Sequence, residues 1–278
     1  MTQPSWNLDG PVVLVGAGKM GTALLSGWLA AGLDPRELVV LDPYPSREAL
    51  ALCCDHGAGM AASVEQLAGS APSVLVLAVK PQVMAGALPA VAICAGPDTV
   101  TLSIAAGRNM ASFEQHLPPG SSVVRAMPNT PAAIGRGITV LCANEHTTGE
   151  QRDLCGRLMA AVGEVSWMKD EALMDAVTAV SGSGPAYVFL LAEAMAAAGV
   201  KAGLDPALAA RLARVTVAGS GELLAQSPLE AAKLRENVTS PGGTTAAALG
   251  VLMGDHGLPA LMEEAVAAAV ARGKALSK

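Results

Sequence analysis

A glycine-rich turn near the N-terminus constrains the fold of this chain more than any other feature. The turn reads Gly16-Ala17-Gly18-Lys19-Met20-Gly21 and joins a short β-branched run, Pro11 to Val15, to a helical stretch, Lys19 to Ala31. In this setting the first glycine makes the tight turn, the second lets a pyrophosphate approach the backbone, and the third allows close helix–strand packing. The motif predicts dinucleotide binding at the helix N-terminus. The alternative is a tight glycine turn without a ligand.

The first half of the chain alternates strand-like and helix-like segments, which is typical of a doubly wound α/β sheet. Val74 to Val79 is almost uniformly apolar, as expected of a parallel strand covered on both faces. A helical stretch near Arg47 to Cys54 follows the second strand-like segment. The remaining strand-like segments are 38–41, 100–104, 123–126 and 138–141.

After Trp167 the strand signals stop, and helical segments follow one another. Tyr187 to Ala198 and Leu258 to Ala271 consist mainly of strong helix formers. Expected helix starts are Asp205–Pro206 and Ser227–Pro228, and expected capping boxes pair Thr147 with Glu150 and Ser227 with Glu230. We therefore predict an α/β fold, with a doubly wound Rossmann-like, dinucleotide-binding domain over residues 1–168 and an all-α domain over residues 169–278.

Composition excludes several classes of protein. Hydrophobic residues are 51% of the 278-residue chain and charged residues only 15%, which excludes a disordered protein because such chains are rich in charge. Aromatic residues are 3% and the net charge is -6. Both values argue against a carbohydrate platform or a nucleic-acid partner, which would need aromatic stacking faces or positive charge.

Neither a membrane span nor a disulfide framework is expected. A spanning helix needs about 20 consecutive apolar residues, and the best stretches, Tyr187 to Val200 and Leu258 to Val270, are interrupted by glutamates. The N-terminus lacks the basic region and apolar core of a signal peptide. The cysteines, which show no metal spacing, are expected to be buried thiols: Cys53, Cys54, Cys94, Cys142 and Cys155. The protein is expected to be soluble and cytoplasmic.

An acidic residue ends the second predicted strand. Asp42 lies about 20 residues after the last glycine of the turn, where a carboxylate can hydrogen-bond the adenosine ribose hydroxyls. Because a carboxylate repels a 2′-phosphate, this position favours NAD over NADP. Arg47 could instead pair with that phosphate, and Asp42 could simply begin the Asp42–Pro43 turn. Either NADPH or NADH therefore remains possible as the cofactor.

Two further turns fall at the carboxyl ends of predicted strands, where doubly wound sheets bind ligands. Ala78-Val79-Lys80-Pro81 closes the buried strand, and Met127-Pro128-Asn129-Thr130-Pro131 follows a later one. Lys80 is more typical of a solvated or positioning group than of a catalytic one. Asn129 is the best polar group of a rigid turn that is poor in donors, and it serves either the turn itself or a nicotinamide contact.

Two Gly/Ser-rich segments precede helices in the second half, Ser181 to Pro185 and Thr239 to Thr245. Each places hydroxyls and backbone amides at a helix N-terminus, which suits a small carboxylate; a simple capping loop is the alternative. The second segment has two glycines and four hydroxyls, more than capping needs, and so predicts anion binding.

No histidine has the setting of a catalytic or metal-binding residue. His56, His116, His146 and His256 are isolated, in loop-like or solvent-facing contexts, and no metal site is predicted. The chemistry is therefore expected to come mainly from a cofactor, with the protein supplying position and electrostatics.

The chain resembles the pyrroline-5-carboxylate reductase family over essentially its whole length. Five segments carry the resemblance: Val15 to Gly21, Ala78 to Pro81, Arg125 to Pro131, Ala176 to Tyr187 and Leu234 to Leu249. The last of them contains Asn237-Val238-Thr239-Ser240-Pro241-Gly242-Gly243-Thr244-Thr245, which resembles the family signature closely. The resemblance implies a homodimer, or a higher oligomer built from dimers, whose helical domains interlock around each active site.

The resemblance also implies roles for individual residues at matching motif positions. The cofactor would contact Gly16, Ala17, Gly18, Lys19, Met20, Ala78, Val79, Lys80, Pro81, Ile104, Ala105, Ala106 and Asn237. The substrate would contact Glu171, Ser240, Gly243, Thr244 and Thr245. Many relatives have small polar residues or arginine where this chain has Asp42, which puts the family's usual preference for NADPH in doubt.

The implied reaction is hydride transfer from NADPH or NADH to the C=N carbon of Δ1-pyrroline-5-carboxylate, giving L-proline in the last step of proline biosynthesis. A protonated imine is already a good electrophile, so no strong acid is obligatory. Our hypothesis is that backbone amides near Gly243 and Thr244 hold the carboxylate. The hydroxyl of Thr245 would act as the catalytic group by hydrogen-bonding the ring nitrogen.

Two competing functions have sequence features that separate them from this one. A 3-hydroxyacid dehydrogenase needs a base or a lysine near the hydride acceptor, and only Lys201 and Lys233 are candidates. A regulatory module that senses dinucleotides without turnover has no use for a second anion-binding loop. The apolar surplus after Trp167 predicts helices that are buried on more than one face, and hence an obligate dimer.

Overall fold

The computed structural model describes residues 6, 8–67 and 69–276. The chain forms two compact units: unit 1 is Met1–Gly182 with Val270–Lys278, and unit 2 is Ser183–Ala269. The helical turns that follow the last strand, up to Gly182, thus pack with the sheet in unit 1. The functional division between residues 168 and 169 stays a prediction.

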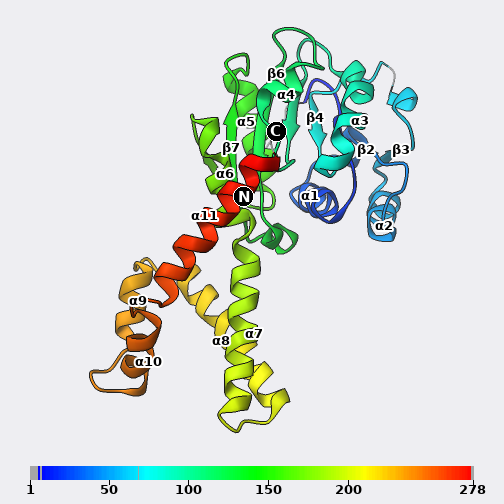
Figure 1. Cartoon of the computed structure of the whole chain (residues 1–278). Coiled ribbons are helices and arrows are strands. Elements are labelled where there is room, and N and C mark those ends of the chain that lie inside the picture. The colour runs from blue at the N-terminus through cyan, green and yellow to red at the C-terminus, as the bar shows by residue number, and fades with distance from the viewer. Residues whose placement is uncertain (1–5, 7, 68, 277–278) are drawn as a thin grey trace. The chain divides into compact units, whose positions relative to one another are not determined.

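Unit 1 is built on a sheet of eight strands within the described residues, in the order β3-β2-β1-β4-β5-β6-β7-β8 (Figure 1). Neighbouring strands are parallel, except that β7 runs antiparallel to β6. This is the doubly wound arrangement that the alternation of segments predicted. The strands are β1 (Val12–Val15), β2 (Leu38–Leu41), β3 (Gly59–Ala61), β4 (Val74–Leu77), β5 (Val100–Ser103), β6 (Ser122–Met127), β7 (Gly137–Ala143) and β8 (Gly163–Trp167).

Helices cover both faces of this sheet. One face is packed against α1 (Lys19–Ala30), α2 (Arg47–His56) and α5 (Gly149–Ala160), and the other against α3 (Pro81–Val91) and α4 (Met110–Glu114). Along β1, Val12 and Leu14 enter the first core cluster while Val13 and Val15 enter the second. Because successive side chains of a strand point to opposite faces, a strand covered on both faces needs an unbroken apolar run.

Short helical turns complete unit 1. The 3₁₀ turns are η1 (Pro35–Glu37), η2 (Val64–Leu67), η3 (Ala92–Cys94), η4 (Thr130–Ile134) and η5 (Glu171–Leu173). The last of them continues into α6 (Met174–Val177) and then into a turn of π-helix, η6 (Thr178–Gly182). Single π turns are common at functional sites because they redirect the residues that follow.

The expected strands and helices lie within a few residues of the observed ones, but two strands escaped prediction. The edge strand β3 has only three residues and begins with a glycine, so it has too few side chains for a periodic signal. Strand β8 is only partly buried at alternate positions, with Glu164 and Ser166 exposed, and lacks a continuous apolar run. In the sheet, β3 pairs with β2 and β8 pairs with β7, and both partners were predicted strands.

One of the four capping predictions was correct and three were wrong. Asp205 caps its helix as expected. No helix starts at Ser227–Pro228, because Ser227 ends one helix and the next begins at Ala231. The capping box near residue 150 is formed by Thr148 with Gln151 instead, because the buried hydroxyl of Thr147 bonds the carbonyl of Val123. The second expected box does not form either. Its residues flank a loop, with Ser227 ending one helix and Glu230 directly preceding the next.

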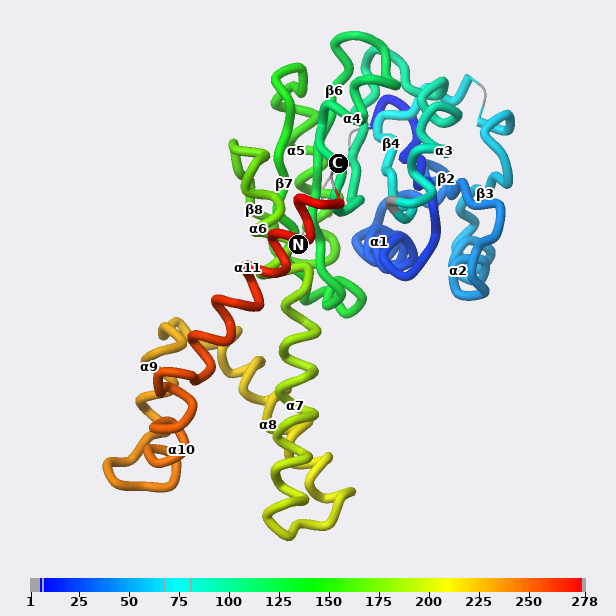
Figure 2. Tube along the Cα trace, in the orientation of Figure 1, coloured from blue at the N-terminus to red at the C-terminus, as the bar shows by residue number. Residues whose placement is uncertain are grey.

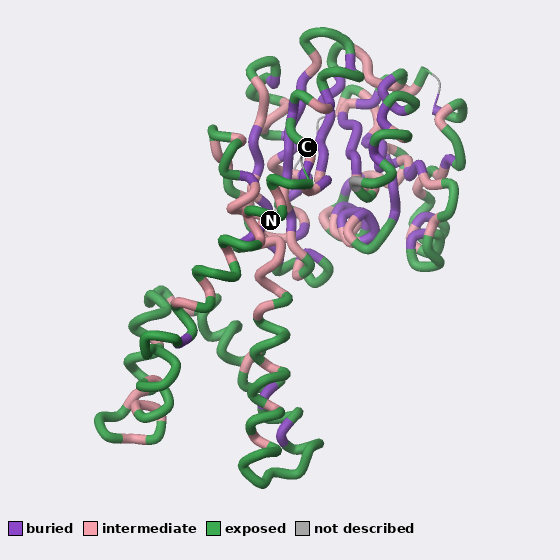
Figure 3. The backbone as a smooth tube through the Cα atoms, viewed as in Figure 1, coloured by how far each residue is buried: buried purple, intermediate pink, exposed green. Residues whose placement is uncertain are grey.

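Unit 2 consists of helices that carry much exposed apolar surface. They are α7 (Gly184–Lys201), α8 (Pro206–Gln226), α9 (Ala231–Asn237), α10 (Thr244–Leu252) and the first part of α11 (Leu258–Leu276). Helices α7 and α8 lie side by side (Figure 2), and a Cβ on Gly199 would lie 3.3 Å from that of Ala209. Exposed residues nevertheless dominate these helices (Figure 3). Phe189 is 68% exposed and Leu190 62% exposed.

One helical run, Glu171–Lys201, is long and apolar enough by length and composition to cross a membrane. Glu193 interrupts the run, which has no 20 consecutive apolar residues, so the expectation from the sequence is not contradicted. Core helices of soluble proteins pass the same test, but other parts of the protein cover them. The window of this run that meets the test is not buried within the chain, whereas Met174 and Ala179 near its start are buried.

Candidate functional site

The three glycines of the first turn differ in what a side chain would meet at each position. Gly16 has φ +94°, and a Cβ there would lie 2.8 Å from Val79 Cγ1. A Cβ on Gly21 would overlap the carbonyl oxygen of Gly16, whereas one on Gly18 would meet nothing within 4 Å. Gly18 is also the N-cap of α1 and makes no side-chain capping bond. The backbone is therefore bare where a pyrophosphate would approach, so the turn fits a dinucleotide.

A cavity of about 700 Å³ opens beside this turn, at the carboxyl ends of β1, β4, β5 and β6. It brings together most of the residues expected to hold the cofactor: Gly18, Lys19, Met20, Ala78, Val79, Lys80, Ile104, Ala105 and Ala106. It also has lining residues that were not predicted as cofactor ligands: Ser46, Met127, Pro128, Asn129, Thr130 and Gly182. Ser46 is the N-cap of α2, and its position just after β2 was the signal that could have found it.

A second cavity, of about 330 Å³, lies at the end of β2. Its lining is mainly apolar and includes Asp42, Tyr44 and Val79. The Asp42 carboxylate is held firmly, because Oδ2 accepts from the backbone N–H of Ala17 (2.7 Å) and Oδ1 accepts from that of Tyr44 (2.8 Å). The residue that was expected to meet the ribose thus lies in this wall and also stabilises the glycine turn.

The two strand-end turns differ in what their polar groups do. Lys80 directly precedes α3, is exposed, and lines the larger cavity, while Pro81 is the first residue of that helix. The Oδ1 atom of Asn129 accepts from the backbone N–H of Ile138 (3.0 Å), which ties its turn to β7. Asn129 therefore has a structural role in the turn even though it also lines the cavity.

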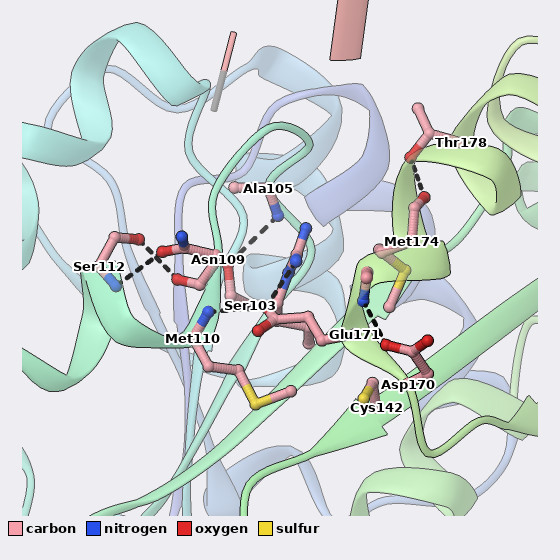
Figure 4. A network of polar contacts seen from close by, with 12 residues as sticks. Ser103, Ala105, Asn109, Met110, Ser112, Cys142, Asp170, Glu171, Met174 and Thr178 are labelled. Carbon is pink, nitrogen blue, oxygen red and sulfur yellow. Dashed lines mark hydrogen bonds and ion pairs between the residues drawn. The ribbon is translucent and has the colours of Figure 1, made fainter. Parts of the chain in front are cut away.

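Glu171 lies at the start of η5 and interacts within unit 1. Its Oε1 atom accepts from Arg125 Nη1 (2.6 Å) and from the backbone N–H of Met110 (2.7 Å) (Figure 4). It does not line the cavity around the glycine turn. Its expected contact with the substrate stays a prediction.

The remaining predicted residues lie in unit 2. Asn237 ends α9, Ser240 and Gly243 lie on the loop that follows, and Thr244 and Thr245 begin α10. The loop closes on itself, because the N–H of Gly243 donates to the carbonyl of Ser240 (3.0 Å) and Gly242 has φ +70°. Gly243 is the N-cap of α10 and makes no side-chain capping bond. Asn237, Ser240 and Thr244 are exposed, and Thr245 is half-buried. The loop therefore presents hydroxyls and the first-turn amides of α10 together.

The histidines and cysteines offer no alternative centre. All four histidines are exposed, and the described residues contain no cluster of three or more His, Cys, Asp or Glu that could hold a metal. Cys53, Cys142 and Cys155 are buried as expected, whereas the expectation was wrong for Cys54, which is exposed, and for Cys94, which is half-buried. Burial raises the pKa of the Cys155 thiol to about 12, so this thiol is protonated and unreactive at neutral pH.

Two known protein families match separate parts of the chain. Residues 171–276 match the family described as pyrroline-5-carboxylate reductase dimerisation. Residues 11–107 match the family described as NADP oxidoreductase, coenzyme F420-dependent.

Individual relatives match nearly the whole chain. Pyrroline-5-carboxylate reductase from Pseudomonas aeruginosa is 40% identical over 96% of this chain and 97% of its own. The Mycobacterium leprae enzyme of that name is 41% identical over 95% of this chain and 96% of its own. Among solved structures, the Coxiella burnetii reductase has a TM-score of 0.88, with 34% identity, and covers 97% of this chain and 99% of its own. The NADP-bound Plasmodium falciparum enzyme has a TM-score of 0.82, with 29% identity, over the same shares.

Proposed function

Because this chain belongs to the pyrroline-5-carboxylate reductase family, it reduces Δ1-pyrroline-5-carboxylate to L-proline with NAD(P)H, and we propose how its residues divide that work. The observation that carries the function is the full-length similarity to enzymes of this activity. The glycine turn and its cavity supply the matching geometry. Nothing in the comparisons supports a regulatory module without turnover.

The two cavities of unit 1 would hold the two halves of the cofactor. Asp42 follows β2, the position from which an acidic side chain meets the adenosine ribose, so the smaller cavity suits the adenosine half. The larger cavity extends from the glycine turn to the ends of β5 and β6 and suits the nicotinamide half. The reduced nicotinamide supplies the hydride. Gly18 leaves room for the pyrophosphate, and Ile104 to Ala106 form a wall that excludes water.

The loop before α10 would hold the substrate. Backbone amides at Gly243 and Thr244, with the hydroxyl of Ser240, would bind the carboxylate, since a helix N-terminus favours a negative charge. The Thr245 hydroxyl would hydrogen-bond the ring nitrogen and orient the C=N carbon for hydride attack. Asn237 would reach the cofactor, and Glu171 the substrate, as the resemblance implies.

The proposed reaction is tested by mixing the purified protein with the imine and either NADH or NADPH while following the absorbance of the reduced cofactor. We expect oxidation of the cofactor and formation of L-proline in equal amounts. Reactions lacking the imine serve as controls for unspecific oxidation. A protein that binds the cofactor but oxidises neither form would contradict the proposed function.

We also propose that the carboxylate of Asp42 makes NADH the preferred cofactor. Asp42→Asn removes the charge at nearly constant shape, so we expect the ratio of kcat/KM for NADPH to that for NADH to rise roughly 10- to 100-fold, the size of an uncompensated repulsion of about 1.5–3 kcal/mol. The ratio is the proper measurement, because damage to the bonds with Ala17 and Tyr44 would lower both values. A wild-type preference for NADPH that this variant leaves unmoved would refute the role of Asp42.

The open space beside Gly18 gives a direct test of the cofactor site. Gly18→Ala places a Cβ in this space without a clash in the empty protein, and the backbone there (φ −70°, ψ −171°) accommodates alanine. We expect nearly unchanged thermal stability but binding weaker by about 1–3 kcal/mol, a roughly 5- to 150-fold rise in the cofactor Kd. Gly86→Ala is the matched control, because its Cβ also meets nothing and it lines neither cavity. Equal Kd values for both variants would place the phosphates elsewhere.

The exposed apolar helices of unit 2 support a further proposal, that the protein is a homodimer. Residues 171–276 match a dimerisation family, and this segment carries most of the large apolar side chains left exposed in the described chain. A second copy of this chain would cover these helices, because each copy would bury the apolar faces of the other. A dimer would also cover the run Glu171–Lys201, so we propose a cytoplasmic enzyme rather than a membrane protein.

A further inference from the structure

A partly buried ion pair, in which the side chain of Glu171 is 29% exposed, lies next to the larger cavity without lining it. Arg125 is on β6 with 8% of its side chain exposed, and its Nη1 atom donates to Glu171 Oε1 at 2.6 Å. The same oxygen accepts from the backbone N–H of Met110 at 2.7 Å (Figure 4). One carboxylate oxygen therefore joins β6, the first residue of α4 and the start of η5.

Each of these three segments continues into a wall of the cavity. The loop before Met110 includes Ile104, Ala105 and Ala106, which line the cavity, and the N–H of Ala105 donates to Ser103 Oγ (3.3 Å) at the end of β5. The strand that carries Arg125 ends in Met127, which begins the lining run up to Thr130.

The third segment leads from Glu171 through η5, α6 and η6 to Gly182, which also lines the cavity. It approaches the second wall closely, because a Cβ on Gly182 would lie 2.9 Å from Met127 Cε. A shift at Glu171 would therefore change the spacing of the walls formed by residues 104–106, 127–130 and 182.

A partly buried ion pair contributes little to stability by itself, because desolvation of the buried charge and solvent screening of the exposed one offset much of their attraction. What this pair supplies is a fixed geometry with three partners. We propose that Arg125 and Glu171 are positioning residues that set the width of the cavity for the reduced cofactor without touching it. This inference rests on the proposed function only in naming the cofactor as the occupant.

The test compares two double variants that both remove the buried charges. Arg125→Met with Glu171→Gln keeps an acceptor for the N–H of Met110, whereas Arg125→Met with Glu171→Met removes it. Both are neutral and of similar volume, so neither leaves a charge buried without a partner. The first measurement is the thermal midpoint. The second is the Kd of NADH and of NADPH in the absence of the imine, determined from the change in cofactor fluorescence on binding.

We expect the two double variants to have thermal midpoints within about 5 °C of each other. The Kd of the preferred cofactor should rise about tenfold in the Met/Met variant and less than about threefold in the Met/Gln variant, one hydrogen bond being worth roughly that factor. Because Kd is measured without the imine, a direct contact of Glu171 with the substrate does not enter it.

Three outcomes would overturn the inference. Both double variants could bind the cofactor as tightly as the wild type, which would make the pair structural only. Both could lose binding equally, which would show that the acceptor for Met110 is irrelevant. The wild type could bind neither cofactor, which would remove the proposed occupant. A wild type that binds tightly but does not turn over defeats the proposed reaction and leaves the positioning role standing.

Discussion

Phe189→Asp is expected to convert the protein from a dimer into an inactive monomer. Phe189 is 68% exposed on α7, in the segment that matches the dimerisation family, so its surface is free in one chain and covered in the proposed dimer. Burying one such side chain contributes about 1.5–3 kcal/mol, and two-fold symmetry loses it twice. The dimer Kd should therefore rise roughly 10²–10⁴-fold, before the cost of burying two carboxylates is added.

Light scattering after size-exclusion chromatography measures this result directly over a range of protein concentrations. Ile93→Asp is the matched control, because Ile93 is 77% exposed on unit 1, outside the dimerisation segment. The control should remain a dimer. Circular dichroism and cofactor binding show whether unit 1 of the Phe189 variant is still folded. A variant that stays dimeric and fully active would exclude this face of α7 from the interface.

Thr245→Ala is expected to lower kcat by roughly ten- to a hundred-fold, equivalent to about 1.4–2.8 kcal/mol of barrier. The variant loses the proposed hydrogen bond from Thr245 to the ring nitrogen, and its fold is expected to stay the same. Thr245 is half-buried at the first turn of α10, and the N-cap Gly243 makes no side-chain capping bond. The cofactor Kd should stay near that of the wild type, because the change lies on the substrate loop.

Thr245→Ser is the control that separates the hydroxyl from the methyl group, since it keeps only the former. It should recover most of the lost rate. The measurements are kcat and KM for the imine at saturating cofactor, together with the thermal midpoint. If the alanine variant turns over at close to the normal rate, Thr245 has no part in the mechanism. If the serine variant is as slow as the alanine variant, the methyl group matters through packing.

Sequence patterns predicted the α/β part of the molecule well because its signals are local. An unbroken apolar run such as Val74–Leu77 requires cover on both faces, and its alternate residues enter the two core clusters on opposite faces of the sheet. The glycine turn was equally readable from its spacing and its place between a strand and a helix, although the atoms that crowd Gly16 belong to Ala78 and Val79, which are distant in the chain. Capping residues were less readable, because a shift of one residue, from Thr147 to Thr148, changes which hydroxyl is free to cap.

The amino-acid sequence by itself determined that this chain forms a doubly wound sheet with a dinucleotide turn, followed by apolar helices, because periodicity, glycine spacing and motif order depend on residues close together in the chain. The tertiary structure decided which distant groups meet. Asp42 holds the amide of Ala17, and Glu171 joins Arg125 to Met110 across separations of 46 and 61 residues. No local pattern encodes such pairs, since they arise only when packing places two strands and a helical turn side by side.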